Sequence, residues 1–190
     1  MNKTGSKHRW LALGLAFGLA WAGEPNTAAR FSPTEDGASV IDLQTTLVWS
    51  RCVEGMAWNG KSCKGKPKLA NHAEAIMLAK SRKEAEGLSW RLPRAPELQK
   101  LAKWRASSPS LSAELFPAAP QDWYWSVTAN VHSAPVNQYN YGNIQQGRTE
   151  GNANRMAFLH GWAVNSETGL ARGDVAKSAR LPVRLVRMSD

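Results

Sequence analysis

Apolar and polar residues alternate, or recur at helical spacing, in separate blocks from Phe31 onward, and these blocks predict both strands and helices. Two β-rich runs, residues 40–43 and 46–49, are separated only by Gln44 and Thr45, which predicts a hairpin. Further strands are predicted over residues 123–128, 156–164, 170–175 and 182–187. In the last of these, apolar residues alternate with arginines, which indicates a half-buried terminal strand. Two polar, proline- or glycine-containing stretches, residues 107–120 and 130–151, are predicted to be loops.

The first helix is predicted over residues 72–86. Asn71 and Glu74 have the spacing of a capping box, in which each side chain accepts a hydrogen bond from the other residue's backbone N–H. Gly87 can adopt the left-handed conformation that ends a helix. His72, in the first turn, is interpreted as a surface residue and not as a metal ligand.

The second helix is predicted to follow the run Trp-Arg-Leu-Pro-Arg-Ala-Pro-Glu-Leu at residues 90–98. Pro93 and Pro96 each fix their own φ and disfavour helix in the residue before them. The run therefore predicts a short extended segment that stops at Pro93, followed by a helix with an apolar face. Glu97 falls in its first turn, where a carboxylate suits the helix dipole.

The N-terminal segment has the three parts of a secretory signal peptide. Basic residues up to Arg9 precede an uncharged apolar run over residues 10–20, and Ala20-Trp21-Ala22 matches the small-x-small cleavage pattern. We therefore expect a signal peptide over residues 1–22, a flexible leader over 23–30 and a single domain over 31–190. We expect an exported protein, periplasmic or secreted, with no transmembrane segment after cleavage.

The two cysteines, Cys52 and Cys63, are expected to form a disulfide, because an exported protein meets an oxidising environment. No Cys-x-x-Cys pair is present, and the histidines are scattered singly, so we expect no zinc or other metal and no cofactor. The sequence has no Gly-x-Ser-x-Gly, His-Glu-x-x-His or phosphate-loop motif, and we expect no enzyme activity. A catalytic pair of carboxylates could come from Glu97, Asp122 and Glu167, but any exported domain of this size has such residues.

The chain is basic, with a formal net charge of +9 that becomes +6 without Lys3, Lys7 and Arg9 of the expected signal peptide. A basic protein favours acidic partners, although such a charge can also serve only solubility. The densest basic run consists of Lys61, Lys64, Lys66 and Lys68. These lysines can bind an anion or form a solvated loop edge. Trp58, beside them, can stack on a sugar ring or pack against the disulfide; Arg180, Arg184 and Arg187 are a second candidate group.

Several runs, in order along the chain, resemble the Lcl C-terminal domain family, named for a bacterial collagen-like adhesin. They are Phe31 with residues 37–49, Arg51-Cys52 with Gly55, Trp58-Asn59-Gly60 and Cys63, Trp90-Arg91-Leu92-Pro93 with Glu97-Leu98, Tyr124-Trp125-Ser126, and residues 183–187. The chain departs from the family pattern at Arg94, where the family usually has Thr, and at Val127, where it usually has Ser. It also lacks the collagen-like repeat and the calcium motif of sugar-binding C-type lectins.

The resemblance implies an α+β fold with two helices packed on antiparallel sheets, C-type-lectin-like and with one disulfide. It implies binding more than catalysis, since the adhesin is associated with sulfated glycosaminoglycans. Two functions remain open. One is an exported binding module for an anionic or sulfated glycan or an envelope surface, in an adhesion-type role. The other is an envelope protein with a protein partner, such as an immunity or inhibitor protein or a pilus-associated accessory. No nucleic-acid partner is expected.

Overall fold

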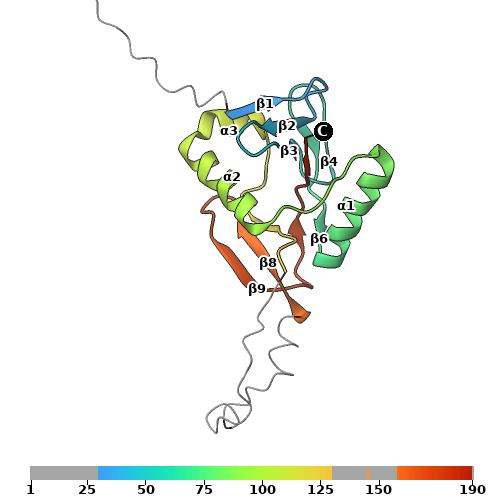
Figure 1. The fold of residues 1–190 in the computed structure, drawn as a ribbon, viewed down its shortest axis with the longest axis vertical. Coiled ribbons are helices and arrows are strands. Elements are labelled where there is room, and N and C mark those ends of the chain that lie inside the picture. The colour runs from blue at the N-terminus through green and yellow to red at the C-terminus, as the bar shows by residue number, and fades with distance from the viewer. Residues whose placement is uncertain (1–29, 130–144, 146–157, 190) are drawn as a thin grey trace, which may run out of the picture.

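The structure is a computed structural model that describes residues 30–129, 145 and 158–189 (Figure 1). The expected signal peptide and nearly all of the expected leader lie outside the described residues. So does almost all of the predicted loop over residues 130–151.

The described residues form an α+β fold of short strands and three helices. The helices are α1 (His72–Glu86), α2 (Ala95–Ser107) and α3 (Pro109–Leu115). The strands are β1 (Phe31–Pro33), β2 (Ser39–Asp42), β3 (Leu47–Ser50), β4 (Met56–Trp58), β5 (Cys63–Gly65), β6 (Leu69–Ala70), β7 (Trp123–Trp125), β8 (His160–Asn165), β9 (Ala171–Ala176), β10 (Leu181–Pro182) and β11 (Val186–Met188). Every strand pairing between them is antiparallel.

The predicted hairpin is confirmed as β2 and β3, which form the centre of a four-stranded sheet in the order β1-β2-β3-β11. The C-terminal strand β11 therefore pairs with a strand from the start of the domain, and this pairing closes the fold. At the other edge, Arg30 lies within the expected leader, yet its Nη2 is 3.0 Å from Oδ2 of Asp42. Burial alone would raise the pKa of Asp42, but hydrogen bonds led by the one from Arg30 outweigh it and lower that pKa.

Helix α1 has the predicted boundaries and the predicted cap. The Asn71 side chain accepts from the backbone N–H of Glu74 at 2.9 Å, and the Glu74 carboxylate accepts from the backbone N–H of Asn71 at 3.0 Å. Gly87 has φ +70°, and its N–H donates to the carbonyl of Lys83, which ends the helix as predicted.

The run at residues 90–98 is the predicted strand-to-helix corner. Arg91 and Val186 exchange backbone hydrogen bonds of 2.9 and 3.0 Å, so the segment pairs with β11 for a single residue. Trp90 and Leu92 are buried on either side of this bridge. Helix α2 then begins at Ala95, with Pro96 in its first turn.

Four strand or loop predictions need correction. The strand predicted over residues 156–164 is β8, which begins only at His160, and residues 156 and 157 lie outside the described residues. Residues 107–120 are not all loop, because α3 lies within them. Pro109 is its first residue, where the missing N–H costs no hydrogen bond. The aromatic strand β7 ends at Trp125 and not at residue 128. The predicted terminal strand is split into β10 and β11, which belong to different sheets, and the residues between them are buried.

Two apolar clusters form the core, and the helices cover them from opposite sides (Figure 1). One cluster lies under α2 and α3 and includes the contacting rings of Phe31 and Trp104, 4.3 Å apart. The other lies under α1 and includes Trp90 and Trp125. The α+β class with antiparallel sheets is thus confirmed, with three helices in place of the two that were predicted.

Candidate functional site

The predicted disulfide is present and joins the basic segment to the core. Cys52 and Cys63 are bonded with Cα atoms 5.5 Å apart, and both residues are buried. Cys63 begins β5, which pairs with β4 in a small hairpin whose register sets Trp58 opposite Cys63. The Asn59 side chain accepts from the backbone N–H groups of Lys61 and Ser62 at the tip. The disulfide fixes the base of this hairpin, and the Asn59 side chain orders its tip.

Two glycines let the segment after β5 fold back against the start of β4. A Cβ on Gly55 would lie 2.6 Å from the backbone nitrogen of Lys68 and 2.7 Å from the backbone oxygen of Lys66. Gly65 has φ +110°, which side chains rarely adopt. The N–H of Lys68 donates to the carbonyl of Glu54 at 2.7 Å and fixes this return. The glycines thereby bring Lys66 and Lys68 beside the hairpin.

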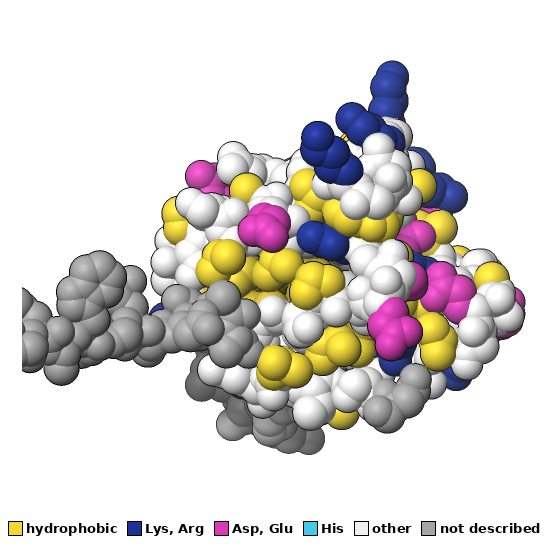
Figure 2. All heavy atoms as spheres, turned by 90° about the horizontal axis from the view of Figure 1, so that it is seen from above, with side chains coloured by type: hydrophobic (Ala, Val, Ile, Leu, Met, Phe, Trp, Pro, Cys, Tyr) yellow, Lys and Arg dark blue, Asp and Glu magenta, His cyan; other side chains and the backbone are white. Residues whose placement is uncertain are grey.

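The structure brings the four candidate lysines, Lys61, Lys64, Lys66 and Lys68, together on this hairpin and its return, and all four are exposed. Within the part of the chain that the structure describes, none of them forms an ion pair. Figure 2 shows Lys and Arg side chains gathered on a protrusion of the face seen from above. We call these four residues the lysine hairpin.

Trp58 is half-buried, and an arginine packs against its ring. The guanidinium of Arg51 lies 4.0 Å from the centre of the Trp58 ring and covers one face of it. Arg51 in turn donates to the carbonyls of Gly37, Glu114 and Leu115, at 2.9 to 3.1 Å. One Trp58 face is therefore closed to a sugar, and Arg51 ties the hairpin to the C-terminal end of α3.

The second candidate basic group is not a cluster. Arg180 pairs with Glu74 at 3.2 Å, and Arg187 lies over the Trp90 ring at 5.7 Å. Arg184 is only 3% exposed, so the prediction that it belongs to a basic surface is wrong. The alternating pattern failed here because the chain between β10 and β11 is buried on both sides.

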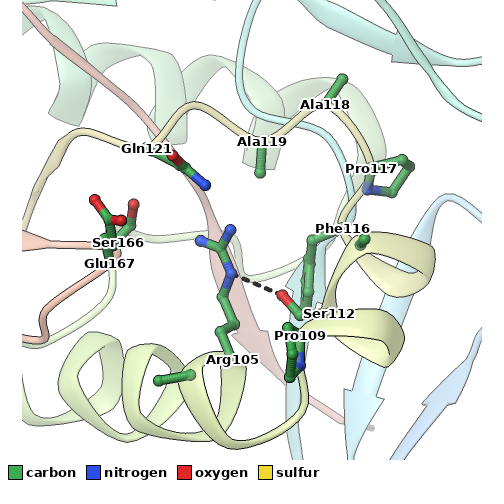
Figure 3. Close-up of a pocket in the computed structure, with 12 residues that line it drawn as sticks. Arg105, Pro109, Ser112, Phe116, Pro117, Ala118, Ala119, Gln121, Ser166 and Glu167 are labelled. Carbon is green, nitrogen blue, oxygen red and sulfur yellow. Dashed lines mark hydrogen bonds between the residues drawn. The ribbon is translucent and has the colours of Figure 1, made fainter.

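Sequence reasoning missed a hollow of about 330 Å³ between α2, α3 and the segment before β7 (Figure 3). Arg105 extends from α2 into it, and its Nε donates to Oγ of Ser112 at 2.9 Å. The wall that faces Arg105 is polar and consists of Gln121, Ser166 and Glu167. Another wall is apolar and consists of Phe116, Pro117, Ala118 and Ala119. These residues come from separate segments without a shared motif, so no sequence signal joins them.

The described ranges, 30–129 and 158–189 with residue 145, contain no group of three His, Cys, Asp or Glu side chains that could hold a metal ion. In the same ranges, no helix has the length and apolar character needed to cross a membrane.

The comparison with known families agrees with the resemblance seen in the residues. The family model of the Lcl C-terminal domain matches residues 38–187, which include the lysine hairpin, the corner at residues 90–98 and the first two residues of the closing strand β11. No curated relative and no solved structure matches the chain, so the kinship with C-type-lectin-like folds stays a prediction. With four-fifths of its length matched by one family model, the chain belongs to the Lcl C-terminal domain family.

Proposed function

We propose that this protein is an exported, non-catalytic binding module for anionic glycans, and that the lysine hairpin is its binding surface. The observation that supports this best is a group of four exposed lysines on one disulfide-bonded hairpin, none of which forms an ion pair with a described residue. Lysines that serve only solubility do not need an ordered backbone, yet the disulfide fixes the base of this hairpin and the Asn59 side chain orders its tip.

The rigidity of the hairpin favours binding, because a surface that is already ordered loses less conformational entropy when a ligand docks. Four charges spread along a narrow element suit a linear polyanion better than a compact anion. Lysine is a point charge with little geometric selectivity, so sulfated glycans of several kinds should compete for the same surface. Exposed charges are screened by salt, and the binding should weaken steeply as ionic strength rises.

Export is part of the proposal. The disulfide between the chain's two cysteines is typical of oxidising compartments, and the first 22 residues have the pattern of a cleaved signal peptide. Both features agree with a protein that meets glycans at or beyond the bacterial envelope.

The test compares the salt concentration at which variants leave a heparin column. We expect the quadruple variant Lys61→Gln, Lys64→Gln, Lys66→Gln, Lys68→Gln to lose retention while its circular dichroism spectrum stays unchanged. The matched control changes four lysines on the helices, Lys80, Lys83, Lys100 and Lys103, which are also exposed. It removes the same charge, so retention close to that of the parent would locate binding on the hairpin.

Equal elution of the hairpin variant and the parent would contradict the assignment of the site. A parent protein that heparin does not retain near physiological salt would contradict glycan binding itself, and would favour a protein partner in the envelope.

A further inference from the structure

Arg184 places a positive charge in the core, and no carboxylate of the described residues pairs with it. Its Nη1 donates to the carbonyls of Ser50 and Arg51, the second at 2.9 Å. Its guanidinium carbon lies 4.8 Å from the centre of the Phe116 ring and 5.9 Å from that of Tyr124. Among the described residues, the buried Nη2 has no hydrogen-bond partner and Arg184 forms no ion pair. A buried charge is normally paired, so this one is an exception that needs an explanation.

A second arginine adds to the same uncompensated charge. Burial lowers the pKa of Arg184, and repulsion from the nearby Arg105 adds to this lowering, while Tyr124 acts in the opposite direction. A small cavity of about 10 Å³, large enough for about one water, is lined by both arginines and by Tyr124 and Ser166. Arg105 and Ser166 also line the 330 Å³ hollow, so the two spaces adjoin at these residues.

We propose that the hollow around Arg105 binds one compact oxyanion, a carboxylate or a sulfate group, with Arg105 as its direct partner and the buried Arg184 as the charge behind it. A guanidinium presents paired N–H donors that match such a group. Arg105 is half-buried and uses its Nε for Ser112, so its outer nitrogens remain for a ligand. Gln121 and Ser166 add polar groups on the facing wall (Figure 3).

The rest of the hollow defines the size and kind of molecule that bears the anion. Its volume is at the small end of ligand pockets, and its walls combine an apolar side at Phe116 with a few polar groups. A single sugar acid or sugar sulfate fits these limits better than a long chain. Glu167 is the opposing feature, because its exposed carboxylate lies on the same wall and repels an anion. This pocket is separate from the lysine hairpin, and the inference does not depend on the proposed function.

The test is a set of NMR titrations of the full mature chain at constant ionic strength. Sodium glucuronate is the carboxylate probe with glucose as its neutral control, and sodium sulfate is compared with sodium chloride. We expect saturable shifts of the amides of Ser112, Gln121 and Ser166 with an oxyanion and none with glucose. Saturation by glucuronate alone assigns a carboxylate, and saturation by sulfate alone assigns a sulfate. Saturation by both assigns a general oxyanion site, and saturation by neither overturns the inference.

Three variants and a control separate the pocket from general charge effects. Arg105→Gln should weaken binding by about tenfold or more, the loss expected for one charge-assisted contact. Unchanged affinity in that variant would overturn the inference. Arg105 is the residue to change because the burial of Arg184 makes its variants prone to misfold. Arg172→Gln removes an exposed arginine that pairs with Asp174 on β9, and it should leave the affinity unchanged.

Glu167→Gln should tighten binding, because it removes the carboxylate that faces the site. Weaker binding in Glu167→Gln would show that this carboxylate itself holds the ligand, which contradicts an anion site. The quadruple lysine variant should bind the small anions as the parent does. Loss of the shifts in that variant would place the anions on the hairpin and overturn the inference, whatever the outcome on heparin.

Discussion

Arg91 and Glu97 form a two-point ion pair across the corner between the extended segment and α2. The Arg91 Nη1 and Nη2 atoms each lie 2.8 Å from a carboxylate oxygen of Glu97. The same carboxylate accepts from the backbone N–H of Arg94 at 2.7 Å, at the start of the helix. Glu97 therefore joins the residue that pairs with β11 to the first turn of α2, within the run that most resembles the family.

The first prediction concerns this ion pair. Glu97→Gln should lower the free energy of unfolding at neutral pH by about 1–3 kcal/mol, because it removes charge-assisted hydrogen bonds in a half-buried site. Urea denaturation measures the change. Glu84→Gln is the control, because Glu84 has only a 3.9 Å contact with Lys80, and both side chains are about two-thirds exposed. Its effect should stay below about 0.5 kcal/mol. Equal effects of the two substitutions would contradict a stabilising role for Glu97.

The second prediction is the pH dependence that follows from the same carboxylate. Burial alone would raise the pKa of Glu97, but hydrogen bonds from Arg91 and Arg94 outweigh it and hold the pKa below its ordinary value of 4.5. The unfolded chain then binds the proton more tightly than the folded one, so the stabilisation exists above pH 4.5 and is lost as pH falls through the folded value. The stabilities of the parent and of Glu97→Gln should converge in acid. A constant difference down to pH 3 would contradict the lowered pKa.

The third prediction concerns Arg94, which precedes α2. Its backbone is extended, with φ −78° and ψ 154°, and its exposed side chain makes no capping hydrogen bond. Glu97 already supplies one half of a capping box, so Arg94→Thr should supply the other and stabilise the protein by about 0.5–1 kcal/mol. Arg94→Ala, which cannot cap, is the matched control. A loss of stability in Arg94→Thr alone would mean that the arginine side chain has a role of its own.

The fold predictions made from the sequence alone succeeded where a local pattern determines the structure. The cap and end of α1 follow from Asn71, Glu74 and Gly87, and the disulfide follows from two cysteines in a chain that is expected to be exported. They failed where the outcome depends on contacts between distant segments. Arg184 occupies a position of an alternating pattern, yet distant segments set its surroundings. It donates to carbonyls at the end of β3, and it lies near the ring of Phe116 just after α3 and that of Tyr124 in β7.

The candidate sites divide in the same way. The lysine hairpin was identified because its residues are adjacent in sequence. The hollow around Arg105 was not, because α2, α3 and the turn after β8 each contribute one or a few ordinary residues to it. Helix α3 was missed because a proline-containing stretch predicts a loop, although proline is well tolerated as a first helical residue.

The fourth prediction concerns the disulfide. Replacing both Cys52 and Cys63 by Ser should lower the free energy of unfolding by about 2–3 kcal/mol, the chain-entropy value for a short loop, and lower the melting temperature by several degrees. Thiol labelling of the denatured, unreduced mature protein should find no free thiol. Two free thiols per chain would contradict the bond.

The fifth prediction concerns Trp58. Because Arg51 covers one face of its ring, Trp58→Phe should keep an aromatic partner for that arginine and leave heparin retention unchanged. Trp58→Ala should lower stability, because it leaves the Arg51 guanidinium without its ring. If Trp58→Phe lowered retention as much as the quadruple lysine variant, the indole would contact the glycan directly.

The location of the bound glycan tests the proposed function most directly. Amide chemical shifts of the labelled mature protein can be followed while a heparin tetrasaccharide is added at low salt. The lysine-hairpin account predicts that the largest shifts fall on residues 56–68, and that they shrink as salt is added. Shifts confined to other elements, with the amides of residues 56–68 unmoved, would contradict it.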